Sequence, residues 1–97
     1  MKKEYTHDKK KIFILSEDGD DFDFYKRIMK FIRESIRPED IKEEQVFFDG
    51  ANSKFIKDNL SLEIEYSNWS GTELKVDENT SEEELNRIKE WCTQFLS

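Results

Sequence analysis

Five carboxylates lie within seven residues near the start of the chain and could hold a cation. They are Glu17, Asp18, Asp20, Asp21 and Asp23. Carboxylate oxygens are ligands that Mg²⁺ accepts readily, and the carboxyl end of a strand is where open α/β sheets place their ligands. The apolar run at residues 12–15, directly before the cluster, predicts such a strand. A Mg²⁺ site is therefore the most specific chemical interpretation of this cluster.

The segment that carries these carboxylates resembles the glutamate-glycine-aspartate opening of a Toprim phosphotransfer domain. The resemblance rests on the stretch Ser16-Glu17-Asp18-Gly19-Asp20-Asp21, and it implies Mg²⁺-dependent phosphotransfer by Glu17, Asp20 and Asp21. Asp18 separates Glu17 from Gly19, however, and no later strand ends in an Asp-x-Asp pair. We favour the alternative, in which the cluster is the solvated, capped start of a helix without metal or cofactor.

A second group of carboxylates is predicted on one face of a hairpin. Residues 60–66 and 72–77 alternate between apolar and polar side chains, which is the pattern of two strands with one buried face. The side chains predicted to face outward include one basic residue, Lys75, and four carboxylates. The carboxylates are Glu63, Glu65, Glu73 and Asp77. Like charges opposed across strands repel by roughly 0.2–1 kcal/mol per pair. This face should attract a basic partner, or it is a solvated face kept acidic for solubility.

The turn of this hairpin contains Trp69 among serine, asparagine and glycine residues. A tryptophan there is either folded back on the core or exposed as a binding anchor, and tryptophan is enriched among interface hot spots. We therefore expect partner contacts from Glu63, Glu65, Trp69, Glu73 and Asp77, with Asp18, Asp20 and Asp21 as a second group.

Few other side chains offer chemistry. The one cysteine, Cys92, falls on the apolar side of the last predicted helix, and the one histidine, His7, lies in a polar N-terminal segment. This excludes an internal disulfide and leaves no histidine in the folded part to activate a nucleophile. We expect no catalytic residue, no cofactor and no enzymatic activity.

Length and charge limit the class of protein. The chain has 97 residues, of which 16 are basic and 23 acidic, for a net charge of −7. Residues 1–11 carry +3, which leaves −10 on the other 86. An acidic surface repels phosphate, so direct nucleic-acid binding is not expected. No apolar run is long enough for a signal sequence or a membrane span, and we predict a cytoplasmic protein without membrane contact.

The periodicity predicts a flexible basic arm at residues 1–10 and a single α+β domain at residues 11–97. Strands are expected at residues 11–15, 45–48, 60–66 and 72–77, long helices at 21–37 and 81–96, and a short helix at 53–59. This β-α-β-β-β-α order predicts a two-layer sandwich, with a sheet of about four strands and two long helices on one face. The initial strand-helix-strand unit predicts a right-handed parallel crossover.

Both long helices carry signals at their ends. Asp20 or Asp21 can cap the first helix, and Pro38 ends it. The second helix begins with a capping box formed by Thr80 or Ser81 with Glu83 or Glu84.

Two phenylalanines of the first helix, Phe24 and Phe31, fall outside its main apolar stripe. We interpret them as side contacts with the second helix. The alternative is a homodimer or partner patch.

These patterns favour a small acidic binding protein that inhibits a basic partner, for example a nuclease toxin. Inhibition would come from covering the active or nucleic-acid-binding surface of the partner. In size and charge the chain is similar to bacterial toxin-immunity proteins. Two alternatives are a phage anti-defence inhibitor that acts by charge mimicry and a reduced Toprim-like Mg²⁺-dependent phosphotransfer domain.

Overall fold

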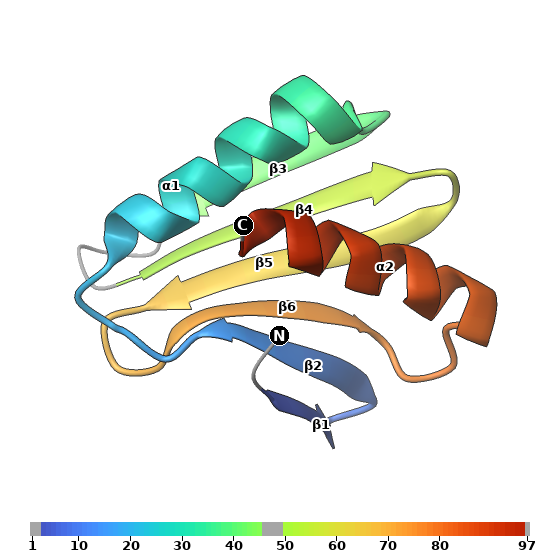
Figure 1. Ribbon diagram of the computed structural model, residues 1–97, viewed down its shortest axis with the longest axis horizontal. Coiled ribbons are helices and arrows are strands. Elements are labelled where there is room, and N and C mark those ends of the chain that lie inside the picture. The colour runs from blue at the N-terminus through green and yellow to red at the C-terminus, as the bar shows by residue number, and fades with distance from the viewer. Residues whose placement is uncertain (1–2, 46–49, 97) are drawn as a thin grey trace.

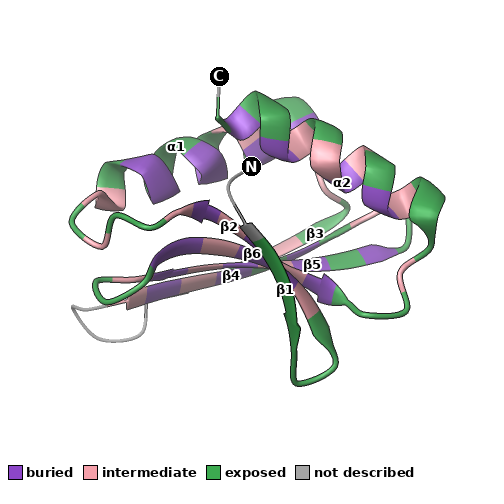
Figure 2. Cartoon of the chain, turned by 60° about the horizontal axis from the view of Figure 1, so that its bottom comes forward, coloured by how far each residue is buried: buried purple, intermediate pink, exposed green. Residues whose placement is uncertain are grey.

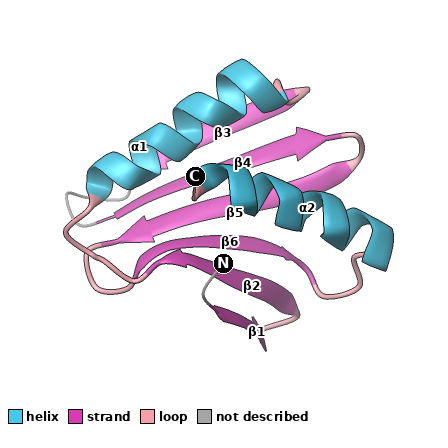
Figure 3. Cartoon of the chain, viewed as in Figure 1, coloured by secondary structure: helices cyan, strands magenta, loops and turns pink. Residues whose placement is uncertain are grey.

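A single sheet with two helices across one of its faces makes up the fold (Figures 1 and 3). The computed structural model describes residues 3–45 and 50–96. Within them the strands are β1 (Lys3–His7), β2 (Lys10–Ser16), β3 (Asp40–Gln45), β4 (Gly50–Lys57), β5 (Leu60–Ser67) and β6 (Gly71–Asp77). The helices are α1 (Phe22–Phe31), continued by a π-helical turn at Ile32–Ile36, and α2 (Glu82–Phe95).

The described residues form a six-stranded sheet with the strand order β1-β2-β6-β5-β4-β3. Every neighbouring pair is antiparallel. The predicted hairpin is confirmed as β5 and β6, with Ile64 opposite Leu74. The α+β class is also correct, but the predicted four-stranded sheet and the parallel crossover are wrong. After α1 the chain enters the far edge strand β3, whose one neighbour among the described strands is β4.

Two of the strands missing from the prediction, β1 and β3, are the edges of the sheet, and the third is the inner strand β4. Residues 3–7, expected in a polar arm, form β1 and pair with β2. Residues 40–45, expected in a charged connection, form β3 and pair with β4. Edge strands tolerate charged side chains because one side of the strand faces solvent. Their sequences therefore lack the apolar alternation that marks an inner strand.

The predicted short helix at residues 53–59 is also wrong, because most of this segment belongs to β4. Buried Ala51, Ser53 and Phe55 alternate along β4 with less buried side chains that face the other way. Of the strand predicted at residues 45–48, only residue 45 is described, as the end of β3, and the rest lies outside the described residues.

Both helix starts are confirmed. The Asp21 carboxylate accepts the Phe24 N–H at 3.0 Å. Ser81 and Glu84 form a complete capping box at the start of α2. The π-helical turn after α1 ends at Arg37, which adopts a left-handed backbone conformation directly before Pro38.

The core lies between the helices and one face of the sheet, and Figure 2 shows the buried segments facing each other across this layer. Its fully buried large side chains come from both layers, and they include Phe13, Leu15, Ile28, Met29, Ile32, Phe55, Leu62, Ile64, Leu74 and Ile88. Among the described residues no helix covers the opposite face of the sheet, where Ile12 is buried and Glu65, Glu73 and Lys75 are partly exposed.

Candidate protein-binding surface

The acidic loop between β2 and α1 is folded by its own polar groups. The Asp18 carboxylate accepts a hydrogen bond from the Asp20 backbone N–H at 2.9 Å. The Asp18 N–H donates to the Ser16 hydroxyl at 3.2 Å. Asp21 caps α1, so its carboxylate favours the positive end of the helix dipole. The prediction of a capped helix start is confirmed.

This loop packs directly on the turn between β5 and β6. A Cβ on Gly19 would lie 2.1 Å from the Asn68 carbonyl oxygen, so the approach requires a glycine. The Tyr66 hydroxyl donates a hydrogen bond to the Gly19 carbonyl oxygen at 2.5 Å. Trp69, which follows Asn68, is thereby placed beside the acidic loop, at the same end of the sheet (Figure 1).

The turn that carries Trp69 is itself constrained. Gly71 has a φ of +83°, and a Cβ there would lie 2.1 Å from the Ser16 carbonyl oxygen. The Trp69 N–H donates to the Ser67 hydroxyl at 3.0 Å. The Trp69 side chain nevertheless points away from the core and is 87% exposed. Of the two conformations that the sequence left open for Trp69, the structure shows the exposed one.

We call residues 17–21 together with residues 67–71 the Trp69 end. No described lysine or arginine forms an ion pair with Asp18, Asp20 or Asp21. The described part of the chain also contains no group of three or more aspartate, glutamate, histidine or cysteine side chains arranged to hold a metal. The Trp69 end thus combines an exposed indole with two exposed carboxylates, Asp18 and Asp20, that pair with no described cation.

The outer face of the hairpin is less uniformly acidic than the sequence predicted. Glu65 does lie opposite Glu73, as expected. Glu63, in contrast, lies between Lys75 on β6 and Lys54 on β4. Lys54 was missed because its segment was assigned to a helix. The Asn52 side-chain amide also donates a hydrogen bond to the Glu63 carboxylate.

Glu73 is a partly buried carboxylate of this face. Burial raises the pKa of Glu73, and the nearby charge of Glu65 raises it further, while the Lys75 ammonium and a hydrogen bond from Tyr5 oppose the shift. Lys75 pairs with Glu65 at 3.2 Å. The outer face is thus a partly neutralised network, in which a partner would compete with internal ion pairs.

Asp77 lies away from the other predicted contact residues. It ends β6, at the opposite end of that strand from Trp69. Its carboxylate accepts the Asn79 N–H at 2.8 Å, and its carbonyl oxygen accepts hydrogen bonds from Thr80. These bonds shape the connection to α2, so the structure does not group Asp77 with Trp69.

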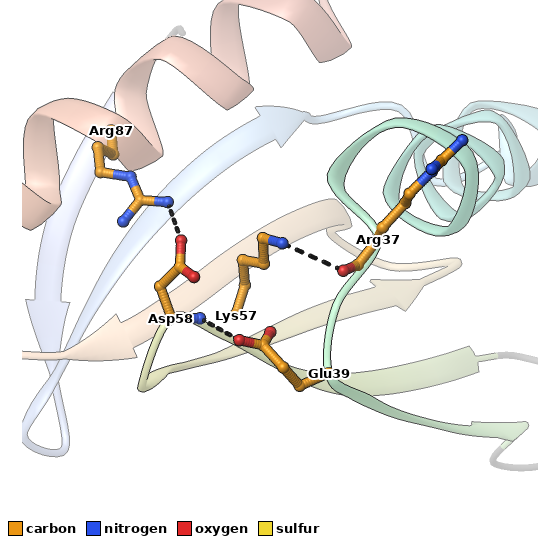
Figure 4. Close-up of polar contacts among 5 residues, drawn as sticks. All are labelled: Arg37, Glu39, Lys57, Asp58 and Arg87. Carbon is orange, nitrogen blue, oxygen red and sulfur yellow. Dashed lines mark hydrogen bonds and ion pairs between the residues drawn. The ribbon is translucent and has the colours of Figure 1, made fainter.

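The opposite end of the sheet, which we call the Asp58 end, is closed by polar contacts (Figure 4). Asp58 pairs with Arg87 of α2 at 2.6 Å, and its backbone N–H donates to Glu39 at 3.0 Å. The Lys57 ammonium donates to the Arg37 carbonyl oxygen at 3.3 Å. The hydrogen bond from Arg87 is the main cause that lowers the pKa of Asp58. At this end one carboxylate and one guanidinium thus pair within the protein, and Lys57 and Glu39 bind backbone groups.

The surplus aromatics of the first helix lie at the seam between the helices. The Phe31 ring packs edge-on against Phe95 of α2, with 5.4 Å between the ring centroids. Phe24 is buried, and the Arg27 guanidinium lies over its ring. The predicted side contact between the helices is confirmed for Phe31, whereas a homodimer through these residues stays a prediction.

Cys92 is fully buried in the core, as predicted. Burial raises the pKa of its thiol to about 12. A protonated, inaccessible thiol is a poor nucleophile.

A cavity of about 440 Å³ between α1 and the sheet was not expected from the sequence. Its apolar floor includes Phe22 and Met29. Its polar groups already bind one another: the Tyr25 hydroxyl contacts Ser53, and Arg33 pairs with Glu43, while Lys26 pairs with Asp23. Binding sites usually add a few polar groups that converge on the ligand. Here those groups are engaged elsewhere, so we favour the Trp69 end as the functional surface.

Comparison of the chain with protein-family models, curated proteins and solved structures gave no match in any of the three. Among the described residues, no helix has the length and apolar character needed to cross a bilayer.

Proposed function

We propose that this chain is an acidic binding protein, not an enzyme, which inhibits a basic partner protein by covering its active or nucleic-acid-binding surface. The observation that carries the proposal is the 87% exposed Trp69, held on a braced turn next to the loop of Asp18 and Asp20, neither of which pairs with a described cation. A large exposed aromatic side chain on a rigid support is typical of an interface anchor.

Charge supports the same proposal. The 86 residues after the lysine-rich start carry a net charge of −10, which attracts a basic protein over a distance of about one Debye length, roughly 10 Å at 0.1 M salt. Such steering raises association rates, while buried anchors mainly slow dissociation. Asp18 and Asp20 would therefore speed the encounter, and Trp69 would hold the complex together.

The structure shifts the centre of the proposed interface relative to the sequence prediction. Glu63, Glu65 and Glu73 lie on the outer face among lysines and hydrogen-bond donors. A partner that bound there would have to replace those interactions. Asp18 and Asp20 have no ion pair with a described cation to lose, so we place Trp69, Asp18 and Asp20 at the centre and the outer-face glutamates at the rim.

The partner class follows from what an acidic surface can imitate. Carboxylates that occupy an electropositive groove displace the phosphates of a nucleic acid, so a nuclease toxin or another basic nucleic-acid-binding protein fits the proposal. A phage inhibitor of a host defence nuclease would use the same contacts. The identity of the captured partner separates an immunity protein from an anti-defence protein.

Site-specific photo-crosslinking tests the proposal. An aromatic photo-crosslinking residue is placed at position 69 and, as a matched control, at the exposed position 90 on α2. We expect a basic protein to crosslink from position 69 and not from position 90. With that partner purified, Trp69→Ala should weaken binding through faster dissociation, and raising the salt concentration should slow association.

Two results would contradict the proposal. One is a partner that binds wild-type protein and the Trp69→Ala variant equally well. The other is binding that does not change between low and high salt, because charge steering would then play no part.

A further inference from the structure

One arginine of the protein, Arg87, contacts both an aromatic ring and a carboxylate. At the Asp58 end, the Arg87 guanidinium lies over the Trp91 ring, 5.4 Å from its centroid. The same guanidinium pairs with the Asp58 carboxylate at 2.6 Å. One arginine is thus bound through the face of an indole and through a carboxylate from a neighbouring turn.

The Trp69 end presents the same two kinds of group without an arginine. Trp69 supplies an exposed indole. The contact between Gly19 and Asn68 places the acidic loop against the turn, so that Asp18, Asp20 and Trp69 are each one residue away from this contact. No described cation pairs with either aspartate.

We infer that the Trp69 end binds an arginine side chain of the partner, with the guanidinium stacked on Trp69 and paired with Asp18 or Asp20. This inference rests on the proposed function and names the group that the surface recognises. The partner's arginine would make the same two kinds of contact at the Trp69 end that Arg87 makes with Trp91 and Asp58.

Arginine fits this arrangement better than lysine. Its planar guanidinium can stack on an indole and donate hydrogen bonds to a carboxylate at the same time. The ammonium of lysine is a compact, strongly hydrated charge, which gains less from the face of the ring. Because the turn is already ordered by Gly71 and by the Ser67 hydroxyl, little conformational entropy is lost on binding.

Nuclear magnetic resonance titration of the full chain tests the inference without a known partner. The probes are two blocked peptides of equal charge, one with three arginines separated by glycines and one with three lysines in the same places. The indole N–H signals of Trp69 and Trp91 report on the two ends separately. We expect the arginine peptide to shift the Trp69 indole and the amides of residues 17–20, leave Trp91 unchanged, and bind about two- to fivefold more tightly than the lysine peptide.

Three variants locate the effect. Trp69→Leu keeps an apolar side chain and should make the two peptides bind equally. Asp20→Asn should weaken arginine-peptide binding about two- to fivefold, whereas Glu90→Gln, which removes the same charge from α2, should not.

Equal affinity for the two peptides in the wild-type protein, or shifts centred away from residues 17–20 and Trp69, would overturn the inference. If a basic partner still depended on Trp69 in the crosslinking experiment, only the recognition of arginine would be wrong. If the arginine preference held but no Trp69-dependent partner existed, the proposed function would be the part that failed.

Discussion

The two ends of the sheet use different interactions to hold their loops. At the Asp58 end, the Arg87 guanidinium pairs with the Asp58 carboxylate, Glu39 accepts the Asp58 backbone N–H, and the Lys57 ammonium donates to the Arg37 carbonyl oxygen. At the Trp69 end, the acidic loop and the β5–β6 turn meet through Gly19 and Gly71, while the Trp69 side chain is 87% exposed. Exposed side chains thus help to hold the fold at the Asp58 end, whereas at the Trp69 end the exposed indole does not.

This difference predicts that stability and binding separate between the two ends. Substitutions of the bracing glycines at the Trp69 end should change folding. Substitutions of its exposed side chains should change binding and leave folding almost unaffected. At the Asp58 end, substitution of the exposed side chains should change folding alone.

The largest effect is expected from Gly71→Ala. A left-handed backbone costs a residue with a Cβ about 1–2 kcal/mol, and here the Cβ would also clash with the Ser16 carbonyl oxygen. We expect the free energy of unfolding to fall by about 2–4 kcal/mol in urea titration. Ser70→Ala, in the same turn, is the matched control and should change it little. Equal stability of the two variants would show that the glycine contact does not brace this end.

A smaller loss is expected from Tyr66→Phe, which removes only the hydroxyl that donates to the Gly19 carbonyl oxygen. The ring keeps its contacts with Phe22 and Tyr25. A hydrogen bond of this kind is worth about 1 kcal/mol, so unfolding should become easier by roughly that amount. Amide exchange of residues 17–20 should accelerate more than that of the Asp58 end. Uniform acceleration would contradict the bracing role.

The ion pair between Asp58 and Arg87 should make the stability of the protein depend on pH. Because Arg87 lowers the pKa of Asp58 below its usual value near 3.8, the ionised carboxylate contributes stability above that usual value and loses it as the pH falls through the lower, folded-state pKa. Asp58→Asn should therefore lower the melting temperature at pH 7, and the difference from wild type should shrink near pH 3. Asp20→Asn is the matched control and should show no such trend.

Part of the inner fold could be predicted from the sequence because burial determines the pattern there. The alternation of Leu62 and Ile64 with glutamates marks β5, and the capping residues mark both helices. The inner strand β4 was missed because its buried positions include Ala51 and Ser53, which give little apolar signal. Edge strands have no such pattern, since one side and one face of β1 and β3 meet solvent. The turns held a usable signal, since Asp8-Lys9 and Asp58-Asn59 both adopt positive φ values, as in two-residue hairpin turns, and each joins a strand that the prediction missed to one that it identified.

The sequence predicted the parts of the candidate site but not the contact between them. Sequence patterns identified the acidic loop and Trp69 as separate features, because 48 positions separate Asp21 from Trp69 along the chain. Their contact depends on the approach of Gly19 to Asn68, which no local pattern encodes. The lysine opposite Glu63 on β4 was missed for a related reason, since Lys54 belongs to a strand whose neighbour could be known only from the register.

The smallest effect on folding is expected from Trp69→Ala. This variant tests most directly whether exposed side chains at the Trp69 end serve binding and not stability. Because the side chain is 87% exposed, its removal should change the free energy of unfolding by no more than about 0.5 kcal/mol. The same substitution at Trp91, which is half-buried under Arg87, should cost clearly more because apolar contact and the stacked guanidinium are both lost.

Binding to a basic partner should reverse the order: Trp69→Ala should cost about 2 kcal/mol through faster dissociation, and Trp91→Ala little once the protein is folded. Urea titrations and binding kinetics of the two variants give both quantities. If Trp69→Ala proved the more destabilising of the two, the Trp69 indole would contribute to folding. The Trp69 end would then not be specialised for binding.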